Sequence, residues 1–79
     1  MSPTVFRAEG LRFYFFSREE ARPHIHVEAP SGEAKFWLDP TVALAQNHGL
    51  SRALITKAAR LISEHEDEIR EAWKAHFGS

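Results

Sequence analysis

The first forty residues alternate between apolar and polar positions in the way that half-buried strands do. Two pairs of short runs carry this pattern, PTVFRA with LRFYFF and HIHVEA with GEAKFWL. Glu9-Gly10 separates the first pair and APSG the second, and both segments are typical of hairpin turns. The pattern therefore predicts two β-hairpins, joined by the polar segment 17–23, which is expected to be a loop.

The same alternation predicts the register of each hairpin. If Pro30 and Ser31 form the second loop, the apolar side chains of both strands share one face, and a one-residue slip would mix the faces. The expected pairs are Ile25 with Phe36, Val27 with Ala34, His24 with Trp37, His26 with Lys35, and Glu28 with Glu33. In the first hairpin they are Arg7 with Arg12, Phe6 with Phe13, and Val5 with Tyr14.

Residues 41–47 (TVALAQN) fit two different elements. Val42 and Leu44 alternate as in a strand, whereas Asp39 and Pro40 can also begin a short helix as its cap and first residue. A fifth, short strand is the favoured prediction.

The last third of the chain predicts one long helix over residues 51–77. Ser51 is a typical N-cap and Gly78 a typical end. Residues expected on the buried face recur at helical spacing through Leu54, Ala58, Leu61, Ile62, His65, Ile69, Trp73 and Phe77. About 26 residues at ~1.5 Å each give roughly 40 Å, twice a typical strand of ~17–20 Å. Such a helix overhangs a small sheet, kinks, or uses its acidic far end (Glu64–Glu71) on a partner.

Length and composition predict a globular protein, and the expected strands and helix make its class α+β. The expected architecture is a single domain, 1–79, with an antiparallel four- to five-stranded sheet over 3–47 and the helix 51–77 on one face. The chain has 79 residues, 43% of them apolar, and a net charge of −1. A chain this short buries only ~60% of its unfolded surface, so a homodimer or a protein partner is an open alternative. The charge balance argues against a protein that coats nucleic acid or membranes.

Cysteine content and the N-terminus narrow the class further. The absence of cysteine excludes disulfides, thiolate zinc sites and cysteine nucleophiles. MSPTVFRAEG lacks the features of a signal peptide, and FYFF, the longest apolar run, is far shorter than the ~20 residues of a membrane span. A cytoplasmic protein without a membrane segment is expected.

The two histidines of HIHV are the first candidate site. His24 and His26 stand at positions i and i+2 of one strand, so they point the same way, ~6–7 Å apart. Imidazoles at that spacing can act as an acid/base pair across a scissile bond. The alternative is a polar strand face that happens to use histidine. A metal site is the weaker functional reading, because no third ligand is fixed by spacing: Glu28, His48, His65 and His76 are all unconstrained. No metal or cofactor is therefore predicted.

A cationic and aromatic set accompanies these histidines if both hairpins share one sheet. Arg7 and Arg12 lie directly opposite each other, which is unfavourable unless they are solvated or an anion lies between them. Phosphodiester binding and cleavage use such groups. In that hypothesis His24, His26, Lys35 and Tyr14 are catalytic, and Arg7, Arg12 and Trp37 bind RNA. Two arginines splayed into water remain the simpler reading.

Several motifs resemble a small prokaryotic family. These are PTVFR, G-x-RFYFFS, RPHIHVE, AKFWLDP and NHGLS, followed by a helix that ends EAWKAHFG. Together they resemble the family catalogued as domain of unknown function 4160, except that Arg22 stands where the family usually has a proline. The resemblance implies a chain encoded beside a small partner protein, as in toxin–antitoxin operons, and assigns no catalytic residue.

Two function classes follow. One is the toxin-like component of a two-gene module, with a cognate antitoxin-like protein as partner and RNA as substrate of an endoribonuclease. The other is a non-catalytic module that binds a protein, or a metal, through the same surface.

Overall fold

The computed structural model describes residues 4–15 and 22–78. Five strands come first along the chain: β1 (Thr4–Ala8), β2 (Leu11–Tyr14), β3 (His24–Ala29), β4 (Gly32–Trp37) and β5 (Ala43–His48). Two helices follow, α1 (Arg52–Glu64) and α2 (Glu66–Phe77). The strands form one sheet in the order β1-β2-β3-β4-β5, with every neighbouring pair antiparallel. The predicted α+β class is confirmed, and the ambiguous segment 41–47 contributes its residues 43–47 to strand β5 and forms no short helix. The loop predicted at 17–23 lies mostly outside the described residues.

The second hairpin has the register that its sequence predicts. All the expected cross-strand pairs are present, from His24 with Trp37 to Glu28 with Glu33. In the first hairpin Arg7 pairs with Arg12 and Phe6 with Phe13, but a register shift between Thr4 and Phe6 places Thr4 opposite Tyr14. The predicted pairing of Val5 with Tyr14 is therefore wrong. A bulge that adds one residue to an edge strand has no signature in simple alternation.

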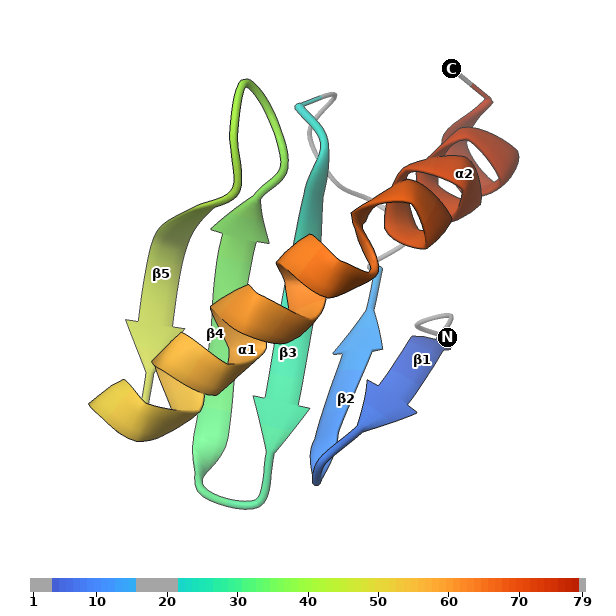
Figure 1. Ribbon diagram of the computed structural model, residues 1–79. Coiled ribbons are helices and arrows are strands. Elements are labelled where there is room, and N and C mark those ends of the chain that lie inside the picture. Colours follow the sequence, from blue (N-terminus) through green and yellow to red (C-terminus); the bar gives the residue numbers. More distant parts are fainter. Residues whose placement is uncertain (1–3, 16–21, 79) are drawn as a thin grey trace.

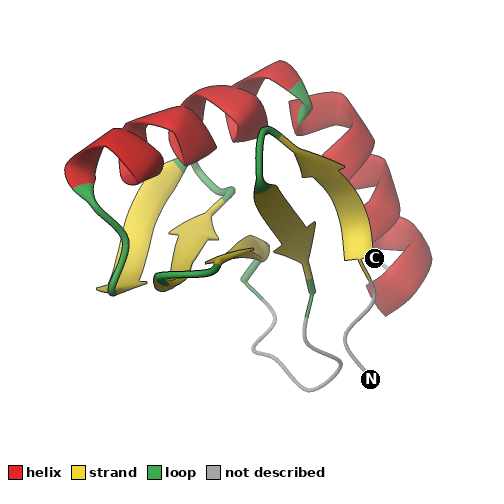
Figure 2. Ribbon diagram, turned by 90° about the horizontal axis from the view of Figure 1, so that it is seen from below, coloured by secondary structure: helices red, strands yellow, loops and turns green. Residues whose placement is uncertain are grey.

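α1 covers one face of the sheet, and α2 leaves that face and runs alongside the β1 side of the sheet (Figures 1 and 2). α1 crosses that face diagonally from β5 toward β2, and α2 continues past the other end in a new direction (Figure 1). The side chains between the two layers form the core, which consists of Leu11, Phe13, Phe15, Ile25, Val27, Ala34, Phe36, Leu38, Leu50, Ala58, Leu61, Ile62, Ile69 and Trp73. The face of the sheet without a helix, visible in Figure 2, is called the outer face below.

The prediction of one long helix is wrong, because the helix breaks at His65. This residue has φ −110° and ψ 19°, outside the helical region, and it is at once the C-cap of α1 and the N-cap of α2. Its ring stacks on Phe6 with centroids 4.3 Å apart. The change of direction keeps both Ile62 and Ile69 fully buried, whereas a straight helix of ~40 Å would run beyond a sheet of this size. Of the alternatives that the predicted length left open, the kink is therefore the one that the structure shows.

The two ends of the helical segment are capped as the sequence predicts. The Ser51 hydroxyl accepts a hydrogen bond from the N–H of Leu54 at 3.2 Å, and Gly78 ends α2 with a left-handed φ of 76°. The acidic residues Glu66–Glu68, expected on the far part of one helix, instead form the first turn of α2. Carboxylates at that position interact favourably with the helix dipole.

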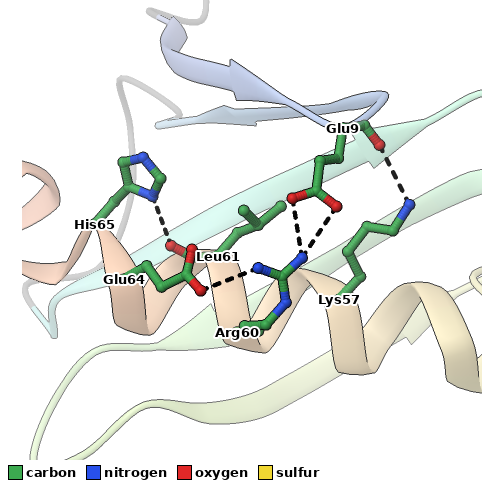
Figure 3. Close-up of polar contacts among 6 residues, drawn as sticks. All are labelled: Glu9, Lys57, Arg60, Leu61, Glu64 and His65. Carbon is green, nitrogen blue, oxygen red and sulfur yellow. Dashed lines mark hydrogen bonds and ion pairs between the residues drawn. The ribbon is translucent and has the colours of Figure 1, made fainter.

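Polar contacts tie each helix to the sheet. The Glu9 carboxylate in the β1–β2 turn accepts hydrogen bonds from Arg60 at 3.0 and 2.9 Å, and Arg60 also pairs with Glu64 at 3.0 Å (Figure 3). The hydrogen bond with Glu9 is the main reason that the pKa of Arg60 is raised. In α2, Arg70 donates to Asp39 at 2.8 Å, and this contact raises the Arg70 pKa despite an opposing effect of burial. No helix in the described segments is both long and apolar enough to cross a membrane.

Candidate functional site

The outer face arranges its side chains in rows that run across the strands. One row follows the register from Arg7 through Arg12, Glu28 and Glu33 to His48. The next row contains Tyr14, His26, Lys35 and Gln46. A third row pairs His24 with Trp37. Every residue predicted for the site therefore lies on the same face of one sheet, because the two hairpins are joined through the pairing of β2 with β3, although His24 and Tyr14 are buried there.

Rings and cations stack along this surface. The Arg12 guanidinium lies 4.4 Å from the centre of the Tyr14 ring, and Tyr14 stacks on His26 at 5.3 Å. Farther along, Trp37 is contacted by the Arg22 guanidinium at 4.0 Å and the Lys35 ammonium at 4.5 Å. Cation–π contacts of this kind fix side chains in place and leave the charge at the surface. The rings of Tyr14, His26 and Trp37 are thus held by their neighbours.

The two histidines of β3 differ sharply in burial. His24 is fully buried, whereas His26 is partly exposed. The His24 ring meets Trp73 of α2 at 5.2 Å and the ring of His26 edge-on at 5.2 Å, and its Nδ1–H donates to the carbonyl of Arg22 at 2.7 Å. A substrate on the outer face can meet His26 directly, but the ring of His24 lies beneath the surface. His24 is placed to hold His26 in position.

A second imidazole, from the strand whose identity was ambiguous in the sequence, lines the same hollow as His26. His48, the last residue of β5, lies opposite Glu33, one row away from His26. Both imidazoles line a hollow of about 170 Å³. We call it the imidazole hollow; its lining residues are His26, Glu33, Ala34, Lys35, Gln46 and His48.

The imidazole hollow contains several groups that exchange protons or carry charge. Strand spacing places the Cα atoms of His26 and His48 on the order of 12 Å apart, two strands and one row. Both side chains line the same hollow, whose volume of about 170 Å³ is large enough for a phosphate group. Lys35 contributes an ammonium although most of its side chain is buried. From the sequence alone His48 was only an unconstrained candidate metal ligand, because neither the end of β5 nor its register follows from local pattern.

The two predicted phosphate-binding arginines line a different depression on the same face. It has a volume of about 500 Å³ and is here called the arginine pocket, lined by Arg7, Gly10, Leu11, Arg12, Glu28, Ala29 and Pro30. Arg12 is held by Thr4, whose hydroxyl accepts from its Nε at 2.8 Å, and by Glu28 at 3.3 Å. Arg7 is exposed on the edge strand. An anion in this pocket can bind the Arg12 guanidinium, which Thr4 and Glu28 hold in place, and the exposed Arg7 guanidinium, which can move to it.

The other candidate ligands are dispersed. His65 is at the helix break and His76 is near the end of α2, where its ring contacts Phe15 and Phe77. Across residues 4–15 and 22–78, no three His, Cys, Asp or Glu side chains are grouped so that they could hold a metal ion. The donor set that is grouped, two imidazoles with an ammonium, suits proton transfer to and from an anionic substrate better than metal coordination.

Comparison with known proteins identifies a family whose model matches most of the chain. A family model described as Domain of unknown function (DUF4160) matches residues 10–74. This segment runs from the first hairpin turn into α2, so it includes both histidines of β3 and all of β4 and β5. Comparisons with curated proteins and with solved structures gave no significant match.

Proposed function

We propose that this chain, which belongs to the DUF4160 family, is the toxin-like component of a two-gene module and cleaves RNA on the outer face of its sheet. One observation carries the proposal: the imidazole hollow combines His26 and His48, from different strands, with Lys35 between them. The resemblance to a family encoded beside small partner proteins supports the biological setting. Each of these supports is independent of the other.

The chemistry of the proposal needs only these groups. A neutral imidazole takes the proton of the ribose 2′-hydroxyl, and the 2′-oxygen attacks the adjacent phosphorus. The second imidazole, protonated, gives its proton to the leaving 5′-oxygen. The bond between phosphorus and that oxygen breaks, leaving a 2′,3′-cyclic phosphate and a 5′-hydroxyl. Lys35 stabilises the additional negative charge on the phosphate oxygens in the transition state.

The remaining predicted residues have supporting roles in this proposal. Tyr14 stacks on one side of His26 and His24 meets the same ring edge-on, so both position the imidazole. Arg7 and Arg12 in the arginine pocket bind a phosphate farther along the RNA strand. Trp37 offers a ring for base stacking, although Arg22 already contacts its face at 4.0 Å and must move for a base to bind there.

The test has a cellular and a purified arm. We expect that expression of the chain alone slows growth and produces new RNA 5′ ends, and that co-expression with the neighbouring gene relieves both. Purified protein is expected to give products that end in a 2′,3′-cyclic phosphate. His26→Ala and His48→Ala should each reduce cleavage by roughly 10²-fold or more, the usual contribution of an acid/base group.

His76→Ala is the matched control, because it removes an exposed imidazole that does not line the hollow. Its cleavage rate should equal that of the parent chain. Intact RNA with the purified parent chain, or undiminished cleavage in both hollow variants, contradicts the proposal.

A non-catalytic protein-binding module is the competing function, and one observation favours it. The row that begins with Arg7 and Arg12 continues with Glu28 and Glu33, which lie directly opposite each other. Neighbouring carboxylates repel a polyanion, whereas alternating patches of both signs are common where proteins bind each other. Substituting both glutamates by Gln separates the two functions: RNA binding should strengthen if RNA is the ligand, and binding of the neighbouring gene product should weaken if a protein is.

A further inference from the structure

The sheet ends at β5, and this edge has unusual properties. In the strand order β1-β2-β3-β4-β5, the outer side of β5 faces no further strand of the described chain. Its sequence, ALAQNH, contains no proline, lysine, arginine or acidic residue, and five of its six positions are exposed. Proteins usually protect an edge strand with charge or proline, because its backbone groups accept another strand. β5 lacks both kinds of protection.

The opposite edge of the sheet is different. β1 carries Arg7, which is exposed, and its hairpin turn is bound to α1 through Glu9. Both edges contain a register irregularity, at Thr4/Phe6 in β1 and opposite Lys35/Phe36 in β5, so bulges do not distinguish them. Charge does. β5 also bears Leu44, the one large apolar side chain that is strongly exposed within the described segments, at 46%.

A second copy of the chain is the occupant that these features fit. Antiparallel pairing of β5 with another β5 about a two-fold axis continues the antiparallel order of the sheet, and each copy supplies a strand of the same length. Identical strands with charged side chains would repel each other, but this strand has no lysine, arginine or acidic residue. Ala43 and Ala45 allow close approach, and Leu44 gains apolar cover from the partner copy.

We propose that two copies of this chain join through β5, so that their two sheets form one continuous sheet. The contact is small, because a strand of six residues spans only ~20 Å, and an interface below ~1,200 Å² is typical of weak or transient association. The dimer therefore dissociates on dilution. It also affects the imidazole hollow, because Gln46 and His48 are residues of β5. The hollows of the two copies then lie on the same face, on either side of the two-fold axis.

The first experiment measures association by sedimentation velocity over a wide range of protein concentration. The sedimentation coefficient of the full chain should rise with concentration toward that of a dimer. Leu44→Lys introduces a like charge at the contact and should weaken association at least tenfold. Thr56→Lys adds the same charge on the exposed side of α1 and serves as the matched control, with association equal to that of the parent chain.

The second experiment uses the absence of cysteine from the chain. A single cysteine can form a disulfide only between two copies, so variants with one cysteine at Ala43, Leu44, Ala45 or Gln46 should yield a crosslinked dimer at the position nearest the axis. Arg7→Cys, on the other edge, should remain uncrosslinked.

Three outcomes overturn the proposal: a parent chain that stays monomeric throughout, Leu44→Lys that associates as strongly as the parent, or crosslinking through Arg7→Cys in place of the β5 positions. If β5 instead binds a different protein, the purified parent chain stays monomeric, and this result also overturns the proposal. None of these measurements depends on RNA cleavage, so a negative result would overturn the dimer without bearing on the proposed ribonuclease activity.

Discussion

Replacement of His24 by alanine should destabilise the protein far more than replacement of His26, although both residues lie on the same face of one strand. His24 is fully buried, and its ring is surrounded by the rings of Trp37, Trp73 and His26 at centroid distances of 5.2–6.0 Å. Its Nδ1–H also donates a hydrogen bond of 2.7 Å to the carbonyl of Arg22. His26 is only partly buried.

The expected magnitude follows from these contacts. Truncating a buried side chain of this size to alanine costs about 2–4 kcal/mol in lost burial and cavity formation, and the lost hydrogen bond adds roughly 1 kcal/mol. We therefore expect His24→Ala to lower the free energy of unfolding by about 3–5 kcal/mol. His26→Ala loses its stacking with Tyr14, which is worth about 1 kcal/mol. A domain of this length has a total stability of ~4–12 kcal/mol, so His24→Ala removes a large part of it.

Urea denaturation followed by tryptophan fluorescence measures this difference. Trp37 and Trp73 both contact His24, so the fluorescence signal reports directly on its surroundings. Far-UV circular dichroism of the same samples shows whether the whole chain unfolds in the same transition. A His24→Ala variant within about 0.5 kcal/mol of the parent chain would refute the packing described here. The expected result also means that lost activity in His24→Ala reports on folding, whereas lost activity in His26→Ala reports on the site.

Three further substitutions test other parts of the structure. Gly32→Ala places its new Cβ in collision with the backbone oxygen of His48, so β5 must shift. We expect a fall in melting temperature and lost protection of β5 amides from hydrogen exchange, and unchanged exchange would contradict the contact. Ser51→Ala removes the cap of α1 and should cost about 1 kcal/mol; in urea denaturation, Ser51→Thr is the control that keeps a hydroxyl. Arg70→Gln removes the ion pair of α2 with Asp39 and should lower the free energy of unfolding. The size of this loss should not vary from about pH 6 to about pH 10, because the pKa of Arg70 is raised and its contribution is lost only when the pH rises above that pKa. A marked pH dependence of this difference in urea denaturation would show that another group controls the contact.

Local sequence was sufficient to predict the elements whose signals are local. The turn at Pro30-Ser31 and the alternation on either side of it fix the register of the second hairpin, because only one register places the apolar residues on one face. The caps Ser51 and Gly78 act through hydrogen bonds within a few residues, so residue type alone predicts them. The bulge near Thr4 has no such local signature, and the register of β1 was predicted incorrectly beyond Phe6.

The break at His65 illustrates a different limit. Apolar residues continue at helical spacing across it, so periodicity alone extends the helix through to Phe77. The break is decided by tertiary contacts, namely the stacking of His65 on Phe6 and the burial of Ile69 against the same core. One local signal was present: Glu66–Glu68 is an acidic run typical of the first turn of a helix, and it marks where α2 begins.

The composition of the candidate site depends on both kinds of information. Strand parity correctly places His24 and His26 on one face, but parity says nothing about what covers each position. Trp73, nearly fifty residues farther along the chain, packs against His24 and removes it from the surface. The register of β4 with β5 brings His48 opposite Glu33 and into the hollow with His26. The imidazole pair that we propose as acid and base therefore comes from two strands, whereas the sequence suggested a pair at positions i and i+2 of one strand. The second member, His48, is on the edge where a further copy of the chain is expected to bind.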